Sequence, residues 1–179
     1  MTESLDAKLQ SYIEEKHVTG ALLERLSVLG GALGPVLKLI ELTNPSANTL
    51  RETLRAADEI CRRDNLELAE LLVSAPLLSI LETTGGSRKE KQKLLRTQLE
   101  KLRYPVRTEI EGQLSECRRA LLSRYGVKFA CPEDLEGDQV EVGFSVRSAE
   151  ELKKLGEAIV RSAGDPACEK LFSMLKGRF

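Results

Sequence analysis

The stretch GVKFACPEDLEGDQVEVGFSVRSAEEL, residues 126–152, decides the fold class of this 179-residue chain. Apolar and polar residues alternate over 127–131 and again over 140–146, which is the period of a β-strand with one buried face. A polar connection separates the two segments, and Ser148 lies three residues before Glu151, the spacing of a capping box that opens a helix. The stretch therefore predicts two short strands followed by a helix.

Helical periodicity prevails in the residues that precede this stretch. A long helix is expected over 105–125, because Ile110, Leu114 and Leu121 recur at spacings of four and seven. Residues 1–84 carry shorter amphipathic segments with turn signals between them, which predict a bundle of five or six short helices. The predicted fold is α+β, mostly α, with an N-terminal helical bundle followed by a long-helix, two-strand, helix module.

One flexible break stands out, at residues 82–87. Gly85 and Gly86 stop the preceding helix, and Ser87 can cap the next one with Glu90 three residues on. We therefore expect two domains. The helical bundle takes residues 1–84, and residues 88–179 hold a basic helix plus a β-β-α module of dimerisation type.

The net charge of −1, from 27 basic and 28 acidic side chains, conceals a strong asymmetry. Residues 87–128 carry 12 basic and 5 acidic side chains, a net charge of +7, and acidic side chains exceed basic ones on both sides. Such a block predicts an anionic partner, although a solvated helix face rich in Lys and Arg has the same composition. The candidate contacts to nucleic-acid phosphates are Arg88, Lys89, Lys91, Lys93, Arg96, Lys101, Arg103 and Arg107.

The sequence gives little support for base-specific recognition of DNA or for enzyme catalysis. Residues 68–81 have the outline of a helix-turn-helix, but the second helix offers only Ser79 to base edges, so core packing is the favoured interpretation. The only histidine is His17, and neither a nucleophile motif nor a carboxylate pair is evident. The four cysteines lack zinc spacing. We expect no enzyme activity, no catalytic residue, no metal and no cofactor.

The sequence also predicts the cellular compartment of the protein. The apolar runs are far shorter than the ~20 residues that span a bilayer. Residues 1–4 show no basic start to a secretory signal. Free thiols in a reducing compartment are the default for cysteines spaced like these. A cytoplasmic protein is expected.

The order of elements from residue 88 onward, basic helix, helix, strand, strand, helix, resembles the C-terminal region of ParB-type chromosome or plasmid partition proteins. The resemblance covers about residues 88–163 and rests on Leu102-Arg103-Tyr104-Pro105, on the turn and strand of 136–144, and on Ser148-Ala149-Glu150-Glu151-Leu152. It implies a dimer that pairs strands across a two-fold axis, a lysine-rich surface that binds DNA without sequence preference, and association with the nucleoid. The family's nucleotide-binding domain and arginine-rich phosphate motif are absent, so no nucleotide site is carried over.

A homodimer is also expected on physical grounds, because two short strands are marginal alone and leave open edges. Its interface would use Val140, Val142, Phe144, Val146, Ile110 and Leu114.

The favoured function is non-catalytic binding of double-stranded DNA by such a dimer. The alternative is a protein–protein adaptor or complex subunit whose basic helix docks an acidic partner, with Leu94, Leu95, Leu99 and Leu102 at the interface. A third hypothesis is an enzyme subunit whose catalytic partner is a separate chain.

Overall fold

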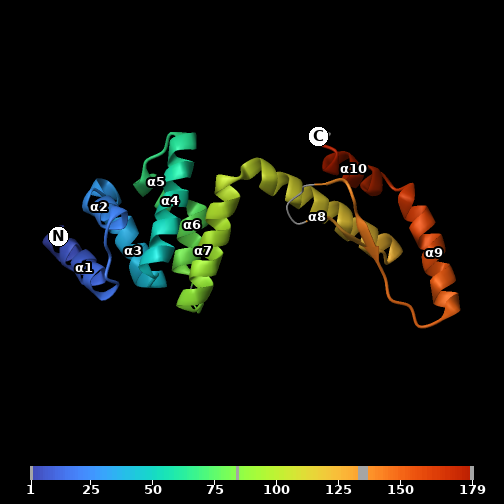
Figure 1. Ribbon diagram of the computed structural model, residues 1–179, viewed down its shortest axis with the longest axis horizontal. Helices are drawn as coiled ribbons and strands as arrows, with labels where there is room; N and C mark the ends of the chain where they lie inside the picture. Colours follow the sequence, from blue (N-terminus) through green and yellow to red (C-terminus); the bar gives the residue numbers. More distant parts are fainter. Residues whose placement is uncertain (1, 84, 133–136, 178–179) are drawn as a thin grey trace. The chain divides into compact units, whose positions relative to one another are not determined.

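The computed structural model describes residues 2–83, 85–132 and 137–177, and it divides the chain into two compact units, residues 1–105 and 106–179 (Figure 1). Each unit has its own hydrophobic core. Helices make up 74 % of the structure, which also contains a small antiparallel sheet of two strands. This composition confirms the predicted α+β, mostly α class.

Unit 1 is a bundle of short helices, as the sequence predicts for its N-terminal part. Its elements are α1 (Thr2–Glu15), α2 (Ala21–Ser27), the 3₁₀ turn η1 (Gly30–Ala32), α3 (Leu33–Thr43), α4 (Ala47–Asp64), α5 (Leu68–Leu72), α6 (Ala75–Glu82) and α7 (Arg88–Arg103). The helix pair that resembles a helix-turn-helix, α5 and α6, sends Leu71, Leu72 and Leu77 into the core. The Ser79 hydroxyl donates to the carbonyl of Pro76 within its own helix.

The basic helix α7 belongs to unit 1, so the boundary expected between residues 84 and 88 is wrong in position. The helix packs against α3, α4 and α6, and Leu95 and Leu99 are only 3 % and 2 % exposed. Full burial of one such side chain stabilises the fold by about 1.5–3 kcal/mol, which outweighs the local flexibility of the two glycines. The chain divides after Pro105 instead.

Local signals set both ends of α7. The Ser87 hydroxyl accepts a hydrogen bond from the Glu90 amide at 3.2 Å, and the Ser87 amide donates to the Glu90 carboxylate at 2.7 Å, which confirms the predicted capping box. These bonds lower the pKa of Glu90 below its usual value. At the other end, the helix stops before Pro105, which disfavours helical backbone at Tyr104.

Unit 2 packs a long helix against a two-stranded sheet and a C-terminal helix. Its elements are α8 (Pro105–Tyr125), β1 (Lys128–Ala130), β2 (Glu141–Gly143), α9 (Ala149–Ala163) and α10 (Pro166–Leu175). The core joins Leu121 of α8, Phe129 of β1 and Leu171 of α10. At the start of α9 the Ser148 hydroxyl accepts from the Glu151 amide, but the Glu151 carboxylate bonds the Arg147 amide, so only half of the predicted capping box forms.

The two strands pair with each other inside one chain. They run antiparallel, with Phe129 opposite Val142. Because β1 has three residues, only 141–143 of the strand expected over 140–146 find a partner. Each described strand therefore keeps one edge that pairs with no other described strand.

The expected dimer residues separate into two groups. Leu114 is 2 % exposed, and Ile110 and Val140 pack against the same core, so these three side chains serve their own unit. Burial corrects the assignment of Leu114 to a dimer face. Val142, Phe144 and Val146 stay accessible, with 40 %, 49 % and 37 % of their surface exposed.

A buried carboxylate ties the end of α8 to the turn before α10. Asp165 is 5 % exposed and accepts hydrogen bonds from the Ala167 amide at 2.8 Å, from Arg124 at 2.8 Å and from the Tyr125 hydroxyl at 2.9 Å. The Ala167 amide, and after it the Arg124 guanidinium, lower the pKa of Asp165 below its usual value. Asp165 therefore acts as the N-cap of α10 and as the anchor of α8.

Membrane-spanning potential is limited to a bent pair of helices. Within the described ranges, no single helix has the length and apolar composition of a span. The segments Ala21–Ser27 and Gly30–Thr43 satisfy those two criteria only together, across a bend of 95°.

Candidate nucleic-acid interface

Three cations of α7 lie in one row along the helix. Lys89, Lys93 and Arg96 are separated by four and three residues, which places them on the same face of an α-helix. At a rise of 1.5 Å per residue, the row is about 10 Å long. The neighbouring stripe of α7, with Leu95 and Leu99, anchors the helix in the core and thereby fixes the direction of the row.

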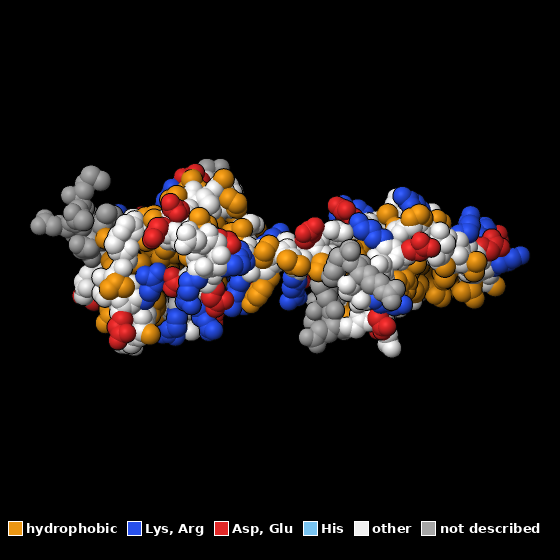
Figure 2. Space-filling view, turned by 90° about the horizontal axis from the view of Figure 1, so that it is seen from above, with side chains coloured by type: hydrophobic (Ala, Val, Ile, Leu, Met, Phe, Trp, Pro, Cys, Tyr) orange, Lys and Arg blue, Asp and Glu red, His pale blue; other side chains and the backbone are white. Residues whose placement is uncertain are grey.

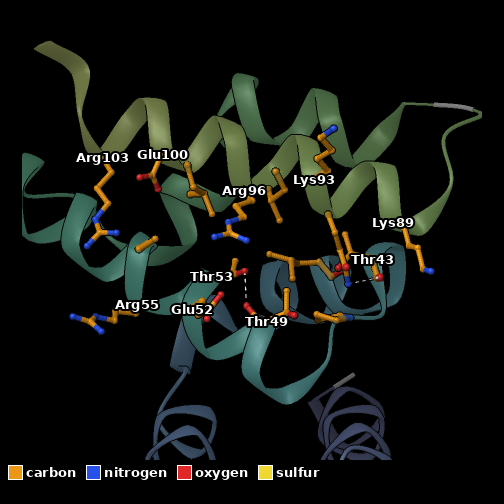
Figure 3. A pocket seen from close by; sticks show the side chains of 16 residues that line it. Thr43, Thr49, Glu52, Thr53, Arg55, Lys89, Lys93, Arg96, Glu100 and Arg103 are labelled. Atoms are coloured by element: carbon orange, nitrogen blue, oxygen red, sulfur yellow. Dashed lines mark hydrogen bonds between the residues drawn. The ribbon is translucent and has the colours of Figure 1, made fainter. Parts of the chain in front are cut away.

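The row borders a groove of about 510 Å³ between α4 and α7, called here the α4–α7 groove (Figure 3). Thr49, Glu52, Thr53 and Arg55 of α4 form the facing wall, and Figure 3 shows them across from the α7 side chains. The Thr53 hydroxyl donates to the Thr49 carbonyl at 2.8 Å. The wall of α4 is therefore polar along its length.

One end of the groove is fixed by a side chain of α7. The Gln92 amide donates to the Thr43 carbonyl at the end of α3, at 3.0 Å, across 49 residues of sequence. Leu95 and Leu99 lie at the base of the groove. The groove therefore has an apolar base, a polar wall on α4 and cations along one rim.

The three cations of the row are not neutralised by neighbours. No ion pair or side-chain hydrogen bond joins Lys89, Lys93 or Arg96 to another described residue, and all three are exposed. Glu52 and Glu100 also line the groove, so its charge is mixed but cationic on balance. Positive charge with no internal partner is available to an anion from solution.

The other predicted cations do not join this row. Lys91 donates to the Leu81 carbonyl at 2.8 Å and caps the end of α6. Lys101 has an interaction within the chain, and Arg88 is exposed at the helix start, outside the groove. The predicted set of eight therefore splits, and three members form a shared surface.

Two arginines of the predicted set form ion pairs. Arg103 lies in the groove but pairs with Glu59 of α4 at 2.6 Å and stacks on Tyr104, with 5.0 Å from its guanidinium carbon to the ring centre. Arg107 belongs to unit 2 and pairs with Glu111 at 2.7 Å. Both have a carboxylate partner that a phosphate would have to displace.

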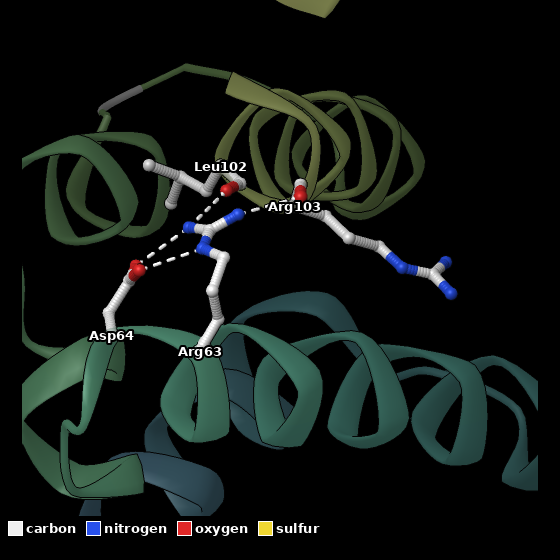
Figure 4. A network of polar contacts seen from close by, with 4 residues as sticks. All are labelled: Arg63, Asp64, Leu102 and Arg103. Atoms are coloured by element: carbon white, nitrogen blue, oxygen red, sulfur yellow. Dashed lines mark hydrogen bonds and ion pairs between the residues drawn. The ribbon is translucent and has the colours of Figure 1, made fainter. Parts of the chain in front are cut away.

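Sequence reasoning missed Arg63, which holds the end of α7 in place (Figure 4). Its guanidinium donates to the carbonyls of Arg103 at 2.7 Å and Leu102 at 2.8 Å, and it pairs with Asp64 at 2.7 Å. The hydrogen bond from Arg63 lowers the pKa of Asp64. A cation on the last carbonyls of a helix is favourable in the field of the helix dipole.

Arg55 is a second arginine that the sequence did not point to, and it adds a cation to the α4 wall of the groove. Arg55 is 78 % exposed in its side chain and pairs with Glu59 at 3.3 Å. Only the closeness of the separate helices α4 and α7 reveals either arginine, so no pattern within the sequence could have identified them.

The surface around the groove is mixed in charge. Figure 2 shows Lys and Arg side chains interspersed with Asp and Glu over the visible face of unit 1. Residues 1–105 carry 15 basic and 15 acidic side chains. The cationic row is thus a local feature rather than part of a broadly basic surface.

Comparison with known proteins adds no assignment. No protein-family model, curated protein or solved structure matches the chain. The resemblance to partition proteins therefore stays a prediction. Within the described part of the chain, no group of three His, Cys, Asp or Glu side chains is placed to hold a metal ion.

Proposed function

We propose that the chain binds double-stranded DNA without sequence preference, through phosphate contacts along the α4–α7 groove. The observation that supports this is the row of Lys89, Lys93 and Arg96, exposed and without an ion pair or side-chain hydrogen bond to another described residue. Phosphates on one DNA strand follow each other every 3.4 Å along the duplex axis, so a row of about 10 Å covers about three phosphate steps and offers a phosphate to each of its three cations. Contacts of this kind position a protein without reading bases.

The proposal predicts a modest and measurable salt dependence. Three phosphate contacts give a log–log slope of about −2.7, which weakens binding roughly 40-fold between about 50 and 200 mM salt. Fluorescence anisotropy of a labelled random duplex at several salt concentrations measures this slope. Absence of binding at the lowest salt would contradict the proposal and favour the adaptor function.

A variant in which the three cations of the row are neutralised, compared with a matched control, tests whether the α4–α7 groove is the DNA-binding surface. Removing the row with Lys89→Gln, Lys93→Gln and Arg96→Gln should abolish most of the affinity and the slope. The control removes three cations of unit 1 outside the groove, with Lys8→Gln, Lys16→Gln and Lys38→Gln. These cations pair with carboxylates, and binding should change less than about twofold. Equal losses in both triple variants would assign binding to overall charge rather than to the groove.

The adaptor hypothesis loses most of its proposed interface. Leu95 and Leu99 are buried and Leu102 packs against the core, whereas Leu94 is 51 % exposed. One accessible leucine is a poor basis for a docking face on α7. DNA binding is therefore the better supported function for the basic helix.

The homodimer is part of the proposed function. What supports it is the accessible apolar group of Val142, Phe144 and Val146 beside an open strand edge. A DNA-binding dimer would double the number of phosphate contacts and would act in association with the nucleoid, as partition-like proteins do. Light scattering of the purified chain measures its mass, and a monomer at all concentrations would contradict the dimer.

A further inference from the structure

Unit 2 contains a second concave surface, separate from the α4–α7 groove. A trough of about 660 Å³ lies between α8 and the two-stranded sheet, and it is called here the α8–sheet trough. Its floor is apolar: Phe129 is 8 % exposed, and Leu122 and Val142 expose 44 % and 40 % of their surfaces. Apolar side chains in a concave surface favour a ligand that brings apolar groups of its own.

Cations surround this floor. Arg118 and Arg119 stand on α8 and Lys128 on β1, and all three are exposed. None of them forms an ion pair or side-chain hydrogen bond with another described residue. Glu141 is the one carboxylate in the described lining. The trough therefore combines an apolar floor with a net positive rim.

We propose that the α8–sheet trough binds an acidic peptide segment of a partner protein, with large aliphatic side chains spaced between its carboxylates. The charge of the rim selects carboxylates, and the floor selects aliphatic side chains. Nucleic acid fits this surface less well, because bases stack on accessible aromatic rings and the Phe129 ring is buried. The proposal is independent of the DNA contacts, which lie in unit 1, although the trough shares Val142 with the proposed dimer surface.

The dimensions of the trough specify the spacing of the peptide. Leu122 lies one helical turn from Arg118 and Arg119, about 5–6 Å along α8. An extended chain advances about 3.3 Å per residue, so a carboxylate and an aliphatic side chain two residues apart reach both groups. The α8 lining from Ser115 to Leu122 spans about 10 Å, which a short peptide covers completely.

The test uses the full chain and a defined probe. A fluorescein-labelled nonapeptide that repeats Glu-Ser-Leu should bind saturably, as measured by anisotropy at low salt. Two control peptides replace Glu by Lys, or Leu by Ser, and both should bind at least about tenfold more weakly. Failure of the Glu-Ser-Leu peptide to bind up to about 1 mM would overturn the proposal.

Paired variants assign the surface. Arg118→Glu with Arg119→Glu should weaken peptide binding at least about tenfold, because two attractive charges become repulsive. The matched control reverses another adjacent pair of exposed cations in unit 2, with Lys153→Glu and Lys154→Glu on α9, and should bind the peptide like the natural chain. Circular dichroism of each variant establishes that it is folded, and Leu122→Ser provides a second variant that removes only floor area.

Two other outcomes would overturn the proposal in favour of a different occupant. If the Arg118 and Arg119 variant turns a dimer into monomers and peptide binding does not respond, a second copy of the chain occupies the trough. If that variant lowers DNA affinity instead, the trough is a nucleic-acid surface. The triple variant of the α4–α7 groove should leave peptide binding unchanged, so failure of the DNA proposal and of this one are distinguishable.

Discussion

Leu99→Ala is the most informative perturbation of the fold, because it asks whether α7 is a structural part of unit 1. Leu99 is 2 % exposed in the core that also holds Leu50 and Leu77. Replacing a buried leucine by alanine removes its transfer free energy and leaves a cavity, at a cost of about 2–5 kcal/mol. Leu94 provides the control on the same helix, since it is 51 % exposed and Leu94→Ala should cost less than about 0.5 kcal/mol.

Urea denaturation of the full chain measures this cost. With a slope of about 1–3 kcal/mol per molar for a unit of this size, a loss of 3 kcal/mol lowers the midpoint by about 1–3 M. Hydrogen exchange followed by mass spectrometry separates the units: amides of α3, α4, α6 and α7 should lose protection together, and those of unit 2 should not.

Two results would refute the reasoning. Equal destabilisation by Leu99→Ala and Leu94→Ala would mean that α7 does not present one face to the core. Loss of protection confined to α7, with α3, α4 and α6 unchanged, would place the boundary near residue 86, as the sequence suggests.

Three further predictions concern polar contacts. Arg63→Gln should raise hydrogen exchange severalfold in the last turn of α7 only, because the guanidinium that holds its terminal carbonyls is lost; exchange mass spectrometry reads this directly. Asp165 has a lowered pKa, so its contribution to unit 2 is present above about pH 4 and is lost as the pH falls below that. The Asp165→Asn variant should have a lower free energy of unfolding at neutral pH, and this free energy should depend less on pH. Identical acid denaturation curves for the variant and the natural chain would contradict the role of the carboxylate. Burial, and after it Glu15, raises the pKa of Tyr12 to about 12, so unit 1 should lose stability as the pH rises from about 10 towards 12. Tyr12→Phe should remove that loss at the cost of about 1 kcal/mol for the bond to the Pro45 carbonyl, and an unchanged alkaline unfolding curve would count against it.

The amino-acid sequence by itself determined the helix ends and the class of the fold. The Ser87 and Glu90 bonds, the stop before Pro105 and the alternation that builds β1 and β2 all act within a few residues. Such signals need no distant part of the chain, so they can be read from the order of residues. The capping box at Ser148 was only partly predictable. Its Glu151 carboxylate accepts a hydrogen bond from the Arg147 amide instead of the Ser148 amide.

Only the tertiary structure decided which segments belong together and which cations are available to a partner. The apolar stripe of α7 was evident, but its burial depends on α3, α4 and α6, and α3 ends 45 residues before α7 begins. In the sequence, Lys91 and Arg103 are cations of the same basic helix as Lys93. In the structure, Lys91 donates to the Leu81 carbonyl and Arg103 pairs with Glu59. The physical reason is that periodicity fixes which face of a helix is apolar, whereas packing of distant segments fixes what that face, and the charges beside it, will meet.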